Sequence, residues 1–351
     1  VAADVILAML EQVQESGFLP HMVPPEGEPS SITQPPILGW AVATLFRRTA
    51  CREWAAACLP YLLRFLEWVE RHRDRNANAL PEWQIEGSPL CRSGESGMDN
   101  SPRFDSAVLM DAVDFASYLC HDWNCAAELA ACLGQTATSE ACRRRADRVA
   151  AAVNALLWNE GAGFYFDRRL DDGGVTGVKA ASGFTPLHAG IPTPAQAAAL
   201  RRHLLDPESF GAPLPIPSVS LDAGVYCKDM WRGPTWINLN YLAALGLRRY
   251  GFVQEANGLR EATLAAVQKW YEREGCLFEY YDSLDITSPR LLDRKQRLIT
   301  GRGIAPISDY HWTAALVAAW LLEEKAASGS AAPQTPESSR RSDLDAPLAA
   351  G

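Results

Sequence analysis

The 351-residue chain contains no uninterrupted apolar run of the ~18 residues that a membrane-spanning helix needs. Basic residues are in the minority, because 33 lysines and arginines face 42 acidic residues and leave a net charge of −9. Without a basic stripe, this balance argues against nucleic acid or an anionic membrane as a partner. The chain also has no GxSxG, no P-loop, no GxGxxG ahead of a strand and no HExxH. These absences disfavour α/β-hydrolases, P-loop NTPases, dinucleotide-binding enzymes and zinc metalloproteases.

The nine cysteines do not resemble a disulfide framework. Their number is odd, and several fall in Ala-rich helical stretches, which is typical of small buried apolar residues in a reducing compartment. Cys120, His121 and Cys125 are of metal-ligating type, but their spacing fits no compact zinc pattern. We therefore predict no metal and no cofactor. The N-terminal VAADVILAML has no basic start and no cleavage site, which favours a cytoplasmic location over secretion.

Helical periodicity dominates the chain. Over residues 143–157 the apolar side chains recur at a spacing of 3.6, and Thr138 or Ser139 is a suitable N-cap for this helix. Strand signals are short and confined to 163–169 and 276–282. Further helices are predicted over residues 1–15, 37–47, 51–73, 104–119, 121–133, 194–205, 235–249, 253–273 and 310–325.

Long loops rich in Gly, Pro and aromatic residues separate these helices, at 76–102, 159–183, 206–233 and 282–309. Loops of this length in a compact domain usually carry function. No fixed repeat is visible, which disfavours a solenoid. Paired helices with loops gathered at one end indicate an all-α fold, a toroid or α/α barrel over residues 1–326, with a site at the loop-bearing mouth. Residues 327–351 are rich in Ser, Pro, Ala and charge, so a disordered tail is expected there.

The densest group of ionisable residues is GESGMDNSPRFD at 94–105. Its glycines and proline exclude a regular helix through the segment, and Ser101 and Pro102 are suited to begin the next helix as its N-cap and first residue. In one interpretation the charges only cap that helix. A cap uses one or two acceptors, however, so Glu95 and Arg103 are surplus to it and point to a functional loop.

Glu279 lies in a second notable segment, the aromatic run GCLFEYYD at 275–282. A carboxylate in this setting is either a surface residue of a strand or an acid held in an aromatic, sugar-binding pocket. The segment alone leaves both interpretations open.

A third segment, residues 229–241, contains Trp231, Arg232 and Trp236 around a Gly-Pro turn. Indole faces stack on the C–H faces of pyranose rings, and guanidinium groups bind hydroxyls. The alternative is that these side chains form core aromatics and one salt bridge. If they bind sugar, at least one Trp should line the same pocket as Arg232. Gln34 could contact the same ligand, although turn chemistry alone explains the prolines that follow it.

Two carboxylates far apart in sequence, on loops rich in Trp, Tyr and Arg, are what glycosidic bond cleavage needs. One protonates the leaving oxygen, and the other activates water or attacks the anomeric carbon. Asp99 and Glu279 fit this requirement. In an inverting enzyme their carboxyls would face one pocket about 6.5–9.5 Å apart.

Several of these motifs resemble glycoside hydrolase family 63. ESGMDNSPRFD at 95–105 is similar to the ESGxDxSPR motif of this family, and the trehalases of family 37 carry a related SGxDxSSR. WRGPTWIN at 231–238, FEYY at 278–281 and WTAA at 312–315 resemble later elements of family 63. QPP at 34–36 is like that of the bacterial mannosylglycerate and glucosylglycerate hydrolases within it.

The resemblance implies an (α/α)6 barrel and an inverting α-glycosidase acting on a short α-glucoside or α-mannoside, in the bacterial cytoplasmic branch of the family. It assigns Asp99 as the general acid and Glu279 as the general base. The other residues that it implies in or beside the sugar site are Gln34, Glu95, Arg103, Trp231, Arg232 and Trp236.

One departure from the family pattern concerns the N-terminal part of the barrel. The bacterial solute hydrolases carry another helical hairpin before QPP, with a Trp-Asp pair that binds the terminal sugar. This sequence has 33 residues before Gln34 and no such pair, so we expect a barrel without its first helical hairpin. This departure favours one alternative, a non-catalytic carbohydrate-binding or scaffold protein on the same fold, against which the presence of Asp99 and Glu279 argues. A further alternative is a different α/α-barrel hydrolase, a trehalase-like one.

Overall fold

Helices make up most of the computed structural model, which describes residues 1–329. The 3-10 turns in this part of the chain are Pro102–Phe104, Ala181–Phe184 and Pro289–Leu291. The strands are β1 (Met110–Asp111), β2 (Trp158–Asn159), β3 (Phe164–Tyr165) and β4 (Arg168–Arg169). The α-helices are α1 (Ala2–Leu10), α2 (Leu38–Thr49), α3 (Arg52–Arg73), α4 (Val113–Cys132), α5 (Thr136–Leu156), α6 (Thr185–Ala189), α7 (Pro194–Leu205), α8 (Ile237–Arg249), α9 (Val253–Glu274), α10 (Arg297–Thr300) and α11 (His311–Gly329).

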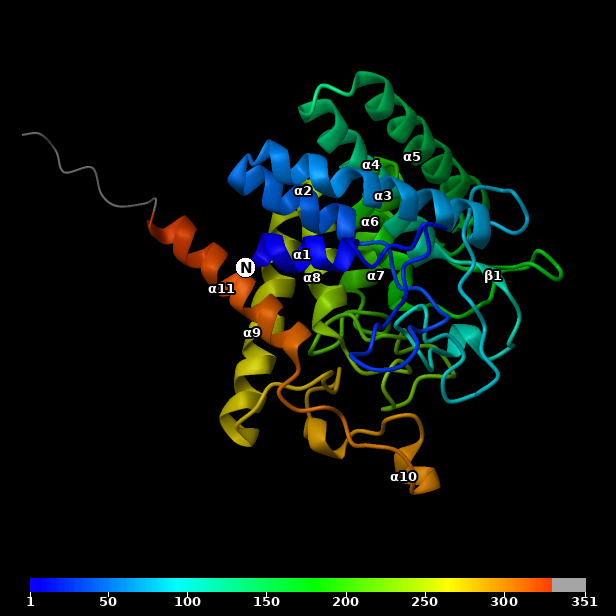
Figure 1. Cartoon of the computed structure of the whole chain (residues 1–351). Helices are drawn as coiled ribbons and strands as arrows, with labels where there is room; N and C mark the ends of the chain where they lie inside the picture. The colour runs from blue at the N-terminus through cyan, green and yellow to red at the C-terminus, as the bar shows by residue number, and fades with distance from the viewer. Residues whose placement is uncertain (330–351) are drawn as a thin grey trace, which may run out of the picture.

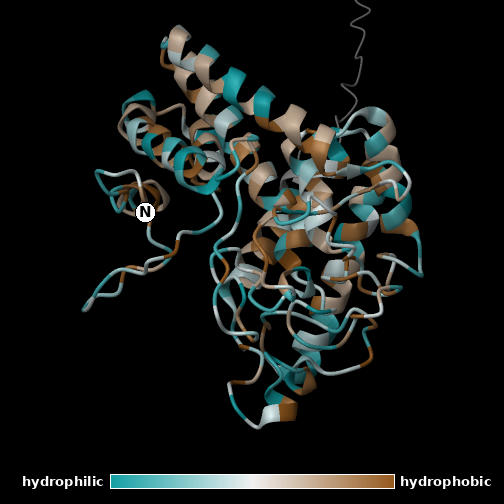
Figure 2. Cartoon of the chain, turned by 90° about the vertical axis from the view of Figure 1, so that its right-hand side faces the viewer, coloured by the Kyte–Doolittle hydropathy of each residue, from teal (hydrophilic) through white to brown (hydrophobic). Residues whose placement is uncertain are grey.

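Five of these helices form an inner series in which each packs on the next: α2 on α4, α4 on α6, α6 on α8, and α8 on α11. Helices α3, α5 and α9 pack against α4 or α8 from outside, and α1 packs on α2 and α3 (Figure 1). The inner helix α4 is buried along almost its whole length, whereas α5 buries a single stripe. Hydrophobic residues accordingly gather where the helices pack, and hydrophilic ones on their outward faces (Figure 2). The predicted all-α toroid is confirmed.

Helix boundaries follow the sequence pattern closely in most places. Helix α7 has the predicted bounds, because Pro194 occupies its first position and Thr193 forms a capping box with Gln196. The two helices predicted over 121–133 and 104–119 are instead one helix, α4, that begins at Val113. The predicted cap of the helix that includes residues 143–157, at Thr138 or Ser139, is wrong, because α5 already begins at Thr136 with Gln135 as its N-cap.

The segment between Ser101 and α4 differs most from the prediction. Only a 3-10 turn follows Ser101, and the chain then becomes extended to form β1. Strand β1 pairs antiparallel with β4, Met110 opposite Arg169. The backbone groups of Met110 and Asp111 are used in this ladder, which interrupts the helix predicted over 104–119. Helix α4 obtains its N-terminal acceptor from elsewhere, because the Asp167 carboxylate accepts the Val113 amide at 2.9 Å.

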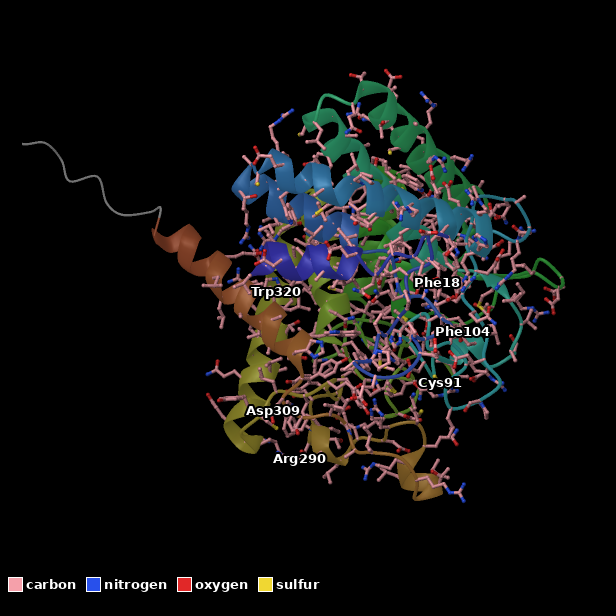
Figure 3. The ribbon with its side chains drawn as sticks, viewed as in Figure 1. Phe18, Cys91, Phe104, Arg290, Asp309 and Trp320 are labelled. Carbon is pink, nitrogen blue, oxygen red and sulfur yellow. The ribbon has the colours of Figure 1, made fainter. Side chains whose placement is uncertain are left out.

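The long loops gather on one side of the helical ring, although they are far apart in sequence (Figure 1). Cys91 and Phe104 lie on this side, and Trp320 marks α11 on the other (Figure 3). All nine cysteines are free thiols, as predicted. No helix within residues 1–329 is long and apolar enough to cross a membrane. Of the tail predicted over 327–351, residues 327–329 form the end of α11, and residues 330–351 lie outside the described residues.

Candidate active site

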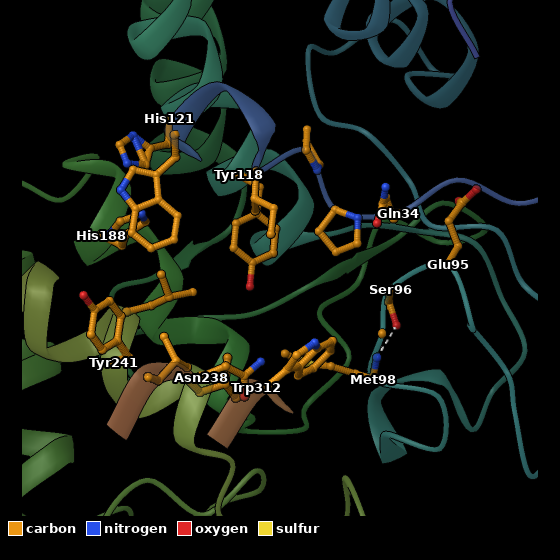
Figure 4. A pocket seen from close by; sticks show the side chains of 18 of the residues that line it. Gln34, Glu95, Ser96, Met98, Tyr118, His121, His188, Asn238, Tyr241 and Trp312 are labelled. Carbon is orange, nitrogen blue, oxygen red and sulfur yellow. Dashed lines mark hydrogen bonds between the residues drawn. The ribbon is translucent and has the colours of Figure 1, made fainter. Parts of the chain in front are cut away.

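A cavity of about 340 Å³ occupies the centre of the ring, below the loop side. Each of the five inner helices contributes to its wall, and the segments around Gln34 and 94–98 form its rim (Figure 4). Aromatic and aliphatic side chains dominate the wall. The residues that matter for the argument below are Gln34, Trp40, Glu95, Tyr118, His121, Asp122, His188, Trp231, Asn238, Tyr241 and Trp312.

Several polar groups of this wall have no hydrogen-bond partner within the described residues. The Asn238 Oδ1 and Trp231 Nε1 atoms are buried and unpartnered. The Tyr118 hydroxyl points toward the middle of the cavity (Figure 4). An unpartnered buried polar atom costs about 1–3 kcal/mol, so these atoms favour a ligand that carries hydroxyl groups.

Glu95 lies at the rim, but its carboxylate is committed to the protein. It accepts hydrogen bonds from Arg73 Nη2 at 2.7 Å and Nε at 3.0 Å, and from the amides of Thr33 at 2.9 Å and Gln84 at 2.8 Å. The side chain is fully buried and turns away from the cavity (Figure 4). Glu95 therefore holds the segment before Gln34 against the rim.

The two tryptophans of the third segment form one stack, with ring centroids 3.7 Å apart and planes 5° from parallel. Trp231 lines the cavity and Trp236 does not. Arg232 lies outside the lining as well, and makes two 2.8 Å hydrogen bonds to the Asp105 carboxylate. It thereby joins the loop of Trp231 to that of Asp105. Trp231 is thus the member of this group that is placed to meet a ligand directly.

Arg103 does not reach the cavity wall. Its side chain is fully buried between Asp114 and Asp167, and it donates to both carboxylates. Burial raises the pKa of Asp167, against the attraction of the guanidinium. Arg103 therefore stabilises the start of α4 from within the protein.

Glu279 is almost fully buried beside the loop that follows it, residues 282–309. Its Oε2 accepts hydrogen bonds from Arg294 Nε at 2.9 Å and from the Ile307 amide at 3.2 Å. Its Oε1 accepts only a longer bond, 3.3 Å, from Arg294 Nη2. Oε1 is consequently the oxygen that is better able to hold a water molecule.

Asp99 forms an ion pair with Lys295, the neighbour of Arg294, at 2.5 Å. The carboxylates of Asp99 and Glu279 both influence the same neighbouring side chain, Tyr310. Burial raises the pKa of Tyr310, and the nearby charges of Glu279 and Asp99 raise it further. Tyr310 packs on Trp312 of the cavity wall, with ring centroids 5.4 Å apart. Neither Asp99 nor Glu279 lines the cavity, although Met98, the neighbour of Asp99, does. Because their partners Lys295 and Arg294 are consecutive residues, the two carboxylates lie near one another beside the cavity wall.

Two histidines lie deep in the cavity; the sequence indicated His121 only as a residue of metal-ligating type and gave no role to His188. The rings of His121 and His188 meet edge to face, 4.2 Å between centroids, and His188 also contacts Trp40. Burial lowers the pKa of His121 to about 4 and that of His188 well below its usual value. Both rings are therefore neutral near pH 7. No single position in the sequence shows that two distant histidines meet, so periodicity alone had no means of finding this pair.

Neutral imidazoles make the stability of the fold depend on pH. With a folded pKa near 4 and an unfolded value near 6.5, His121 binds its proton in the unfolded state first, so stability falls as the pH drops through this interval. We expect its contribution to be roughly 3 kcal/mol. The free energy of unfolding, measured in urea at several pH values between 4 and 6.5, should change less with pH in His121→Gln than in the wild type.

Burial raises the pKa of Asp122 to about 8, so its contribution to stability changes with pH in the opposite direction. Asp122 is present in both proteins, so its contribution cancels when wild type and variant are compared at the same pH. A slope in His121→Gln equal to that of the wild type would contradict the assignment.

Cys120, His121 and Cys125 do not converge. The Cys120 thiol contacts the Ala146 carbonyl at 3.5 Å, and the Cys125 sulfur lies 3.8 Å from His121 Nδ1. Within residues 1–329, no three or more His, Cys, Asp or Glu side chains are grouped as metal ligands would be.

Comparison with known proteins identifies the relatives of this chain. A model of the mannosylglycerate hydrolase MGH1-like glycoside hydrolase domain matches residues 1–313. The mannosylglycerate hydrolase of Thermus thermophilus is 28% identical over 355 residues, which covers 83% of this chain and 77% of the relative. That of Rubrobacter radiotolerans is 27% identical over 361 residues, covering 84% and 75%.

Solved structures agree with these sequence matches. The family 63 mannosylglycerate hydrolase of T. thermophilus in complex with Tris and D-glycerate has a TM-score of 0.75 at 27% identity, over 91% of this chain and 88% of that one. The same enzyme has also been solved with glucose, and that structure has a TM-score of 0.74 at 26% identity, over 91% and 88%. The neutral trehalase of Saccharomyces cerevisiae, at 18% identity and a TM-score of 0.60 over 81% and 64%, shares the fold.

Proposed function

Because the chain belongs to the mannosylglycerate hydrolase MGH1-like glycoside hydrolases of family 63, and is therefore a glycosidase, we propose that it hydrolyses a short α-glucoside or α-mannoside of the glucosylglycerate or mannosylglycerate type. The reaction proceeds with inversion at the anomeric carbon. The observation that carries this proposal is the cavity wall with unpartnered polar atoms, with the paired carboxylates of Asp99 and Glu279 beside it.

In this mechanism Asp99 is the general acid and Glu279 the general base. Asp99 gives its proton to the leaving glycosidic oxygen, while water attacks the anomeric carbon from the opposite face of the sugar ring. Glu279 Oε1 takes the proton of that water, since Oε2 already accepts two hydrogen bonds at 3.2 Å or less. After the step Asp99 is ionised and Glu279 is protonated, and exchange with solvent restores both.

The sugar occupies the cavity, with Trp231 stacking on its ring and with Gln34, Tyr118 and Asn238 bonding its hydroxyls. The remaining predicted residues support these contacts from behind. Glu95 holds the segment before Gln34, and Trp236 stacks behind Trp231. Arg232 holds the loop of Asp105, and Arg103 stabilises the start of α4.

The leaving group lies beside Arg294 and Lys295, which form ion pairs with Glu279 and Asp99. A short carboxylic acid such as glycerate fits these charges, and the T. thermophilus relative has been solved with D-glycerate. The nine free thiols support a reducing, cytoplasmic location, and one trehalase relative is described as cytosolic.

The test is a hydrolysis panel of α-glucosylglycerate, α-mannosylglycerate, trehalose, and α-glucosides and α-mannosides of neutral alcohols. Proton NMR during the first minutes should reveal the β-anomer of the released sugar before mutarotation. We expect turnover of a glycerate glycoside and the β-anomer. Turnover of trehalose alone would favour a trehalase-like hydrolase, release of the α-anomer would exclude inversion, and binding without turnover of any substrate would favour a carbohydrate-binding protein.

A further inference from the structure

Arg294 and Lys295 are adjacent in sequence but hold their carboxylates in different ways. Arg294 is bound to Glu279 through two nitrogens, and its side chain is 16% exposed. Lys295 reaches Asp99 through its single ammonium group, and its side chain is 26% exposed. The first contact is bidentate and sheltered. The second is a single and more exposed contact, so its geometry permits exchange of the partner.

The backbone below Lys295 is held in place. The Asp229 carboxylate accepts the amides of Lys295 at 2.7 Å and of Gln296 at 3.1 Å. Both residues have left-handed backbone angles, with φ of 54° and 57°, which the two hydrogen bonds stabilise. Because the turn is fixed, exchange of the Lys295 partner requires only rotation of its own side chain.

The ion pair conflicts with the role of Asp99 as an acid. A general acid gives its proton from the carboxyl group that meets the leaving oxygen, and the Lys295 ammonium occupies that carboxyl group. The leaving oxygen also has to approach the carboxyl group that Lys295 contacts. The aglycone therefore arrives at the place where the ammonium lies.

We propose that Lys295 is a specificity residue that exchanges its partner, leaving Asp99 for the carboxylate of the aglycone when an anionic substrate binds. This inference rests on the proposed function and deepens it. In a glycosylglycerate the carboxylate is borne by the carbon that carries the leaving oxygen, so it enters next to Asp99. The exchange replaces one ion pair by another, and Asp99 then takes a proton from solvent and passes it to the leaving oxygen.

A neutral aglycone offers Lys295 no such partner. The ammonium then stays on Asp99, and the acid is not available for proton transfer. Selection for an anionic aglycone consequently appears in kcat as well as in KM, which distinguishes the exchange from simple attraction of charge.

The experiment compares wild type with Lys295→Met on two substrates, α-glucosylglycerate and α-glucosylglycerol, and on the corresponding mannosides. The second substrate of each pair has a hydroxymethyl group in place of the carboxylate. For the glycerate substrates we expect kcat/KM of the variant to fall about 30-fold, the usual order for loss of a charged contact. For the glycerol substrates kcat should rise by about threefold or more, because Asp99 is released from its counter-ion.

Two further variants control for effects on the fold. Lys269→Met removes a similar lysine, paired with Asp285 at 2.6 Å at the base of the same loop, and should leave both substrates unchanged. Lys295→Arg keeps the charge and should retain most of the preference for the glycerate substrate. Thermal unfolding of all variants should match that of the wild type.

Equal loss on both substrates, or no change on either, in a folded Lys295→Met would overturn the exchange. Failure of the proposed function has a separate signature, since wild type would then hydrolyse neither glycerate substrate, whatever residue stands at 295.

Discussion

Asp99→Asn is expected to lower kcat for α-glucosylglycerate about 10³-fold, within the range usual for loss of a general acid. The same variant should hydrolyse α-glucosyl fluoride within about tenfold of the wild-type rate, because fluoride departs with little help from a proton. Glu279→Gln should lose activity on both substrates, since water must still be activated, and added azide should restore part of it. Steady-state kinetics of both variants on both substrates make the comparison.

The matched control is Asp172→Asn, which alters an exposed aspartate of the 168–175 hairpin and should change kcat less than twofold. Full activity of Asp99→Asn on the glycoside would place the acid elsewhere. The structure leaves few substitutes nearby, because Glu95 is saturated by Arg73 and two amides and Asp105 is held by Arg232. If Glu279→Gln kept the wild-type kcat, Glu279 would not be the base, and the aromatic segment around it would serve packing alone.

Arg103→Met is expected to lower the free energy of unfolding by about 3–5 kcal/mol, since it leaves two buried carboxylates without their cation. Urea denaturation measures the loss. The added substitution of Asp167 by Asn should recover part of it, because one uncompensated charge is then removed. KM of the folded fraction should stay within about threefold, because the guanidinium does not line the cavity.

Arg47→Met is the matched control, because the Arg47–Glu128 pair is about half exposed and should contribute at most about 1 kcal/mol. A stable Arg103→Met with a KM raised tenfold or more would show instead that Arg103 serves the sugar site.

Most helices were predictable because their apolar spacing lies within the segment itself. In α7 the cap is local as well, since Pro194, Thr193 and Gln196 set the start. The segment after Ser101 was not predictable in this way. Its extended form depends on β4, and the first amide of α4 is bound by Asp167, both distant in sequence.

The candidate site likewise contains residues that local motifs indicate and residues whose role depends on distant parts of the chain. Motif resemblance located the loops around Asp99, Trp231 and Glu279, because their residue order is preserved within short windows. It did not separate residues that face the cavity from those that support it, as Arg103 illustrates. Arg294 and Lys295 were missed, since their meaning comes from carboxylates that the fold brings to them across long stretches of chain.

The stacked indoles of Trp231 and Trp236 have an optical consequence. With their planes 5° from parallel and their centroids 3.7 Å apart, their electronic transitions couple, so the pair absorbs as one unit with its own signature in circular dichroism. One indole faces the cavity and the other is enclosed by protein. A molecule that enters the cavity changes the surroundings of only one partner and so alters the coupling itself. The protein thus contains an intrinsic, label-free reporter of occupancy at the wall where a sugar would lie.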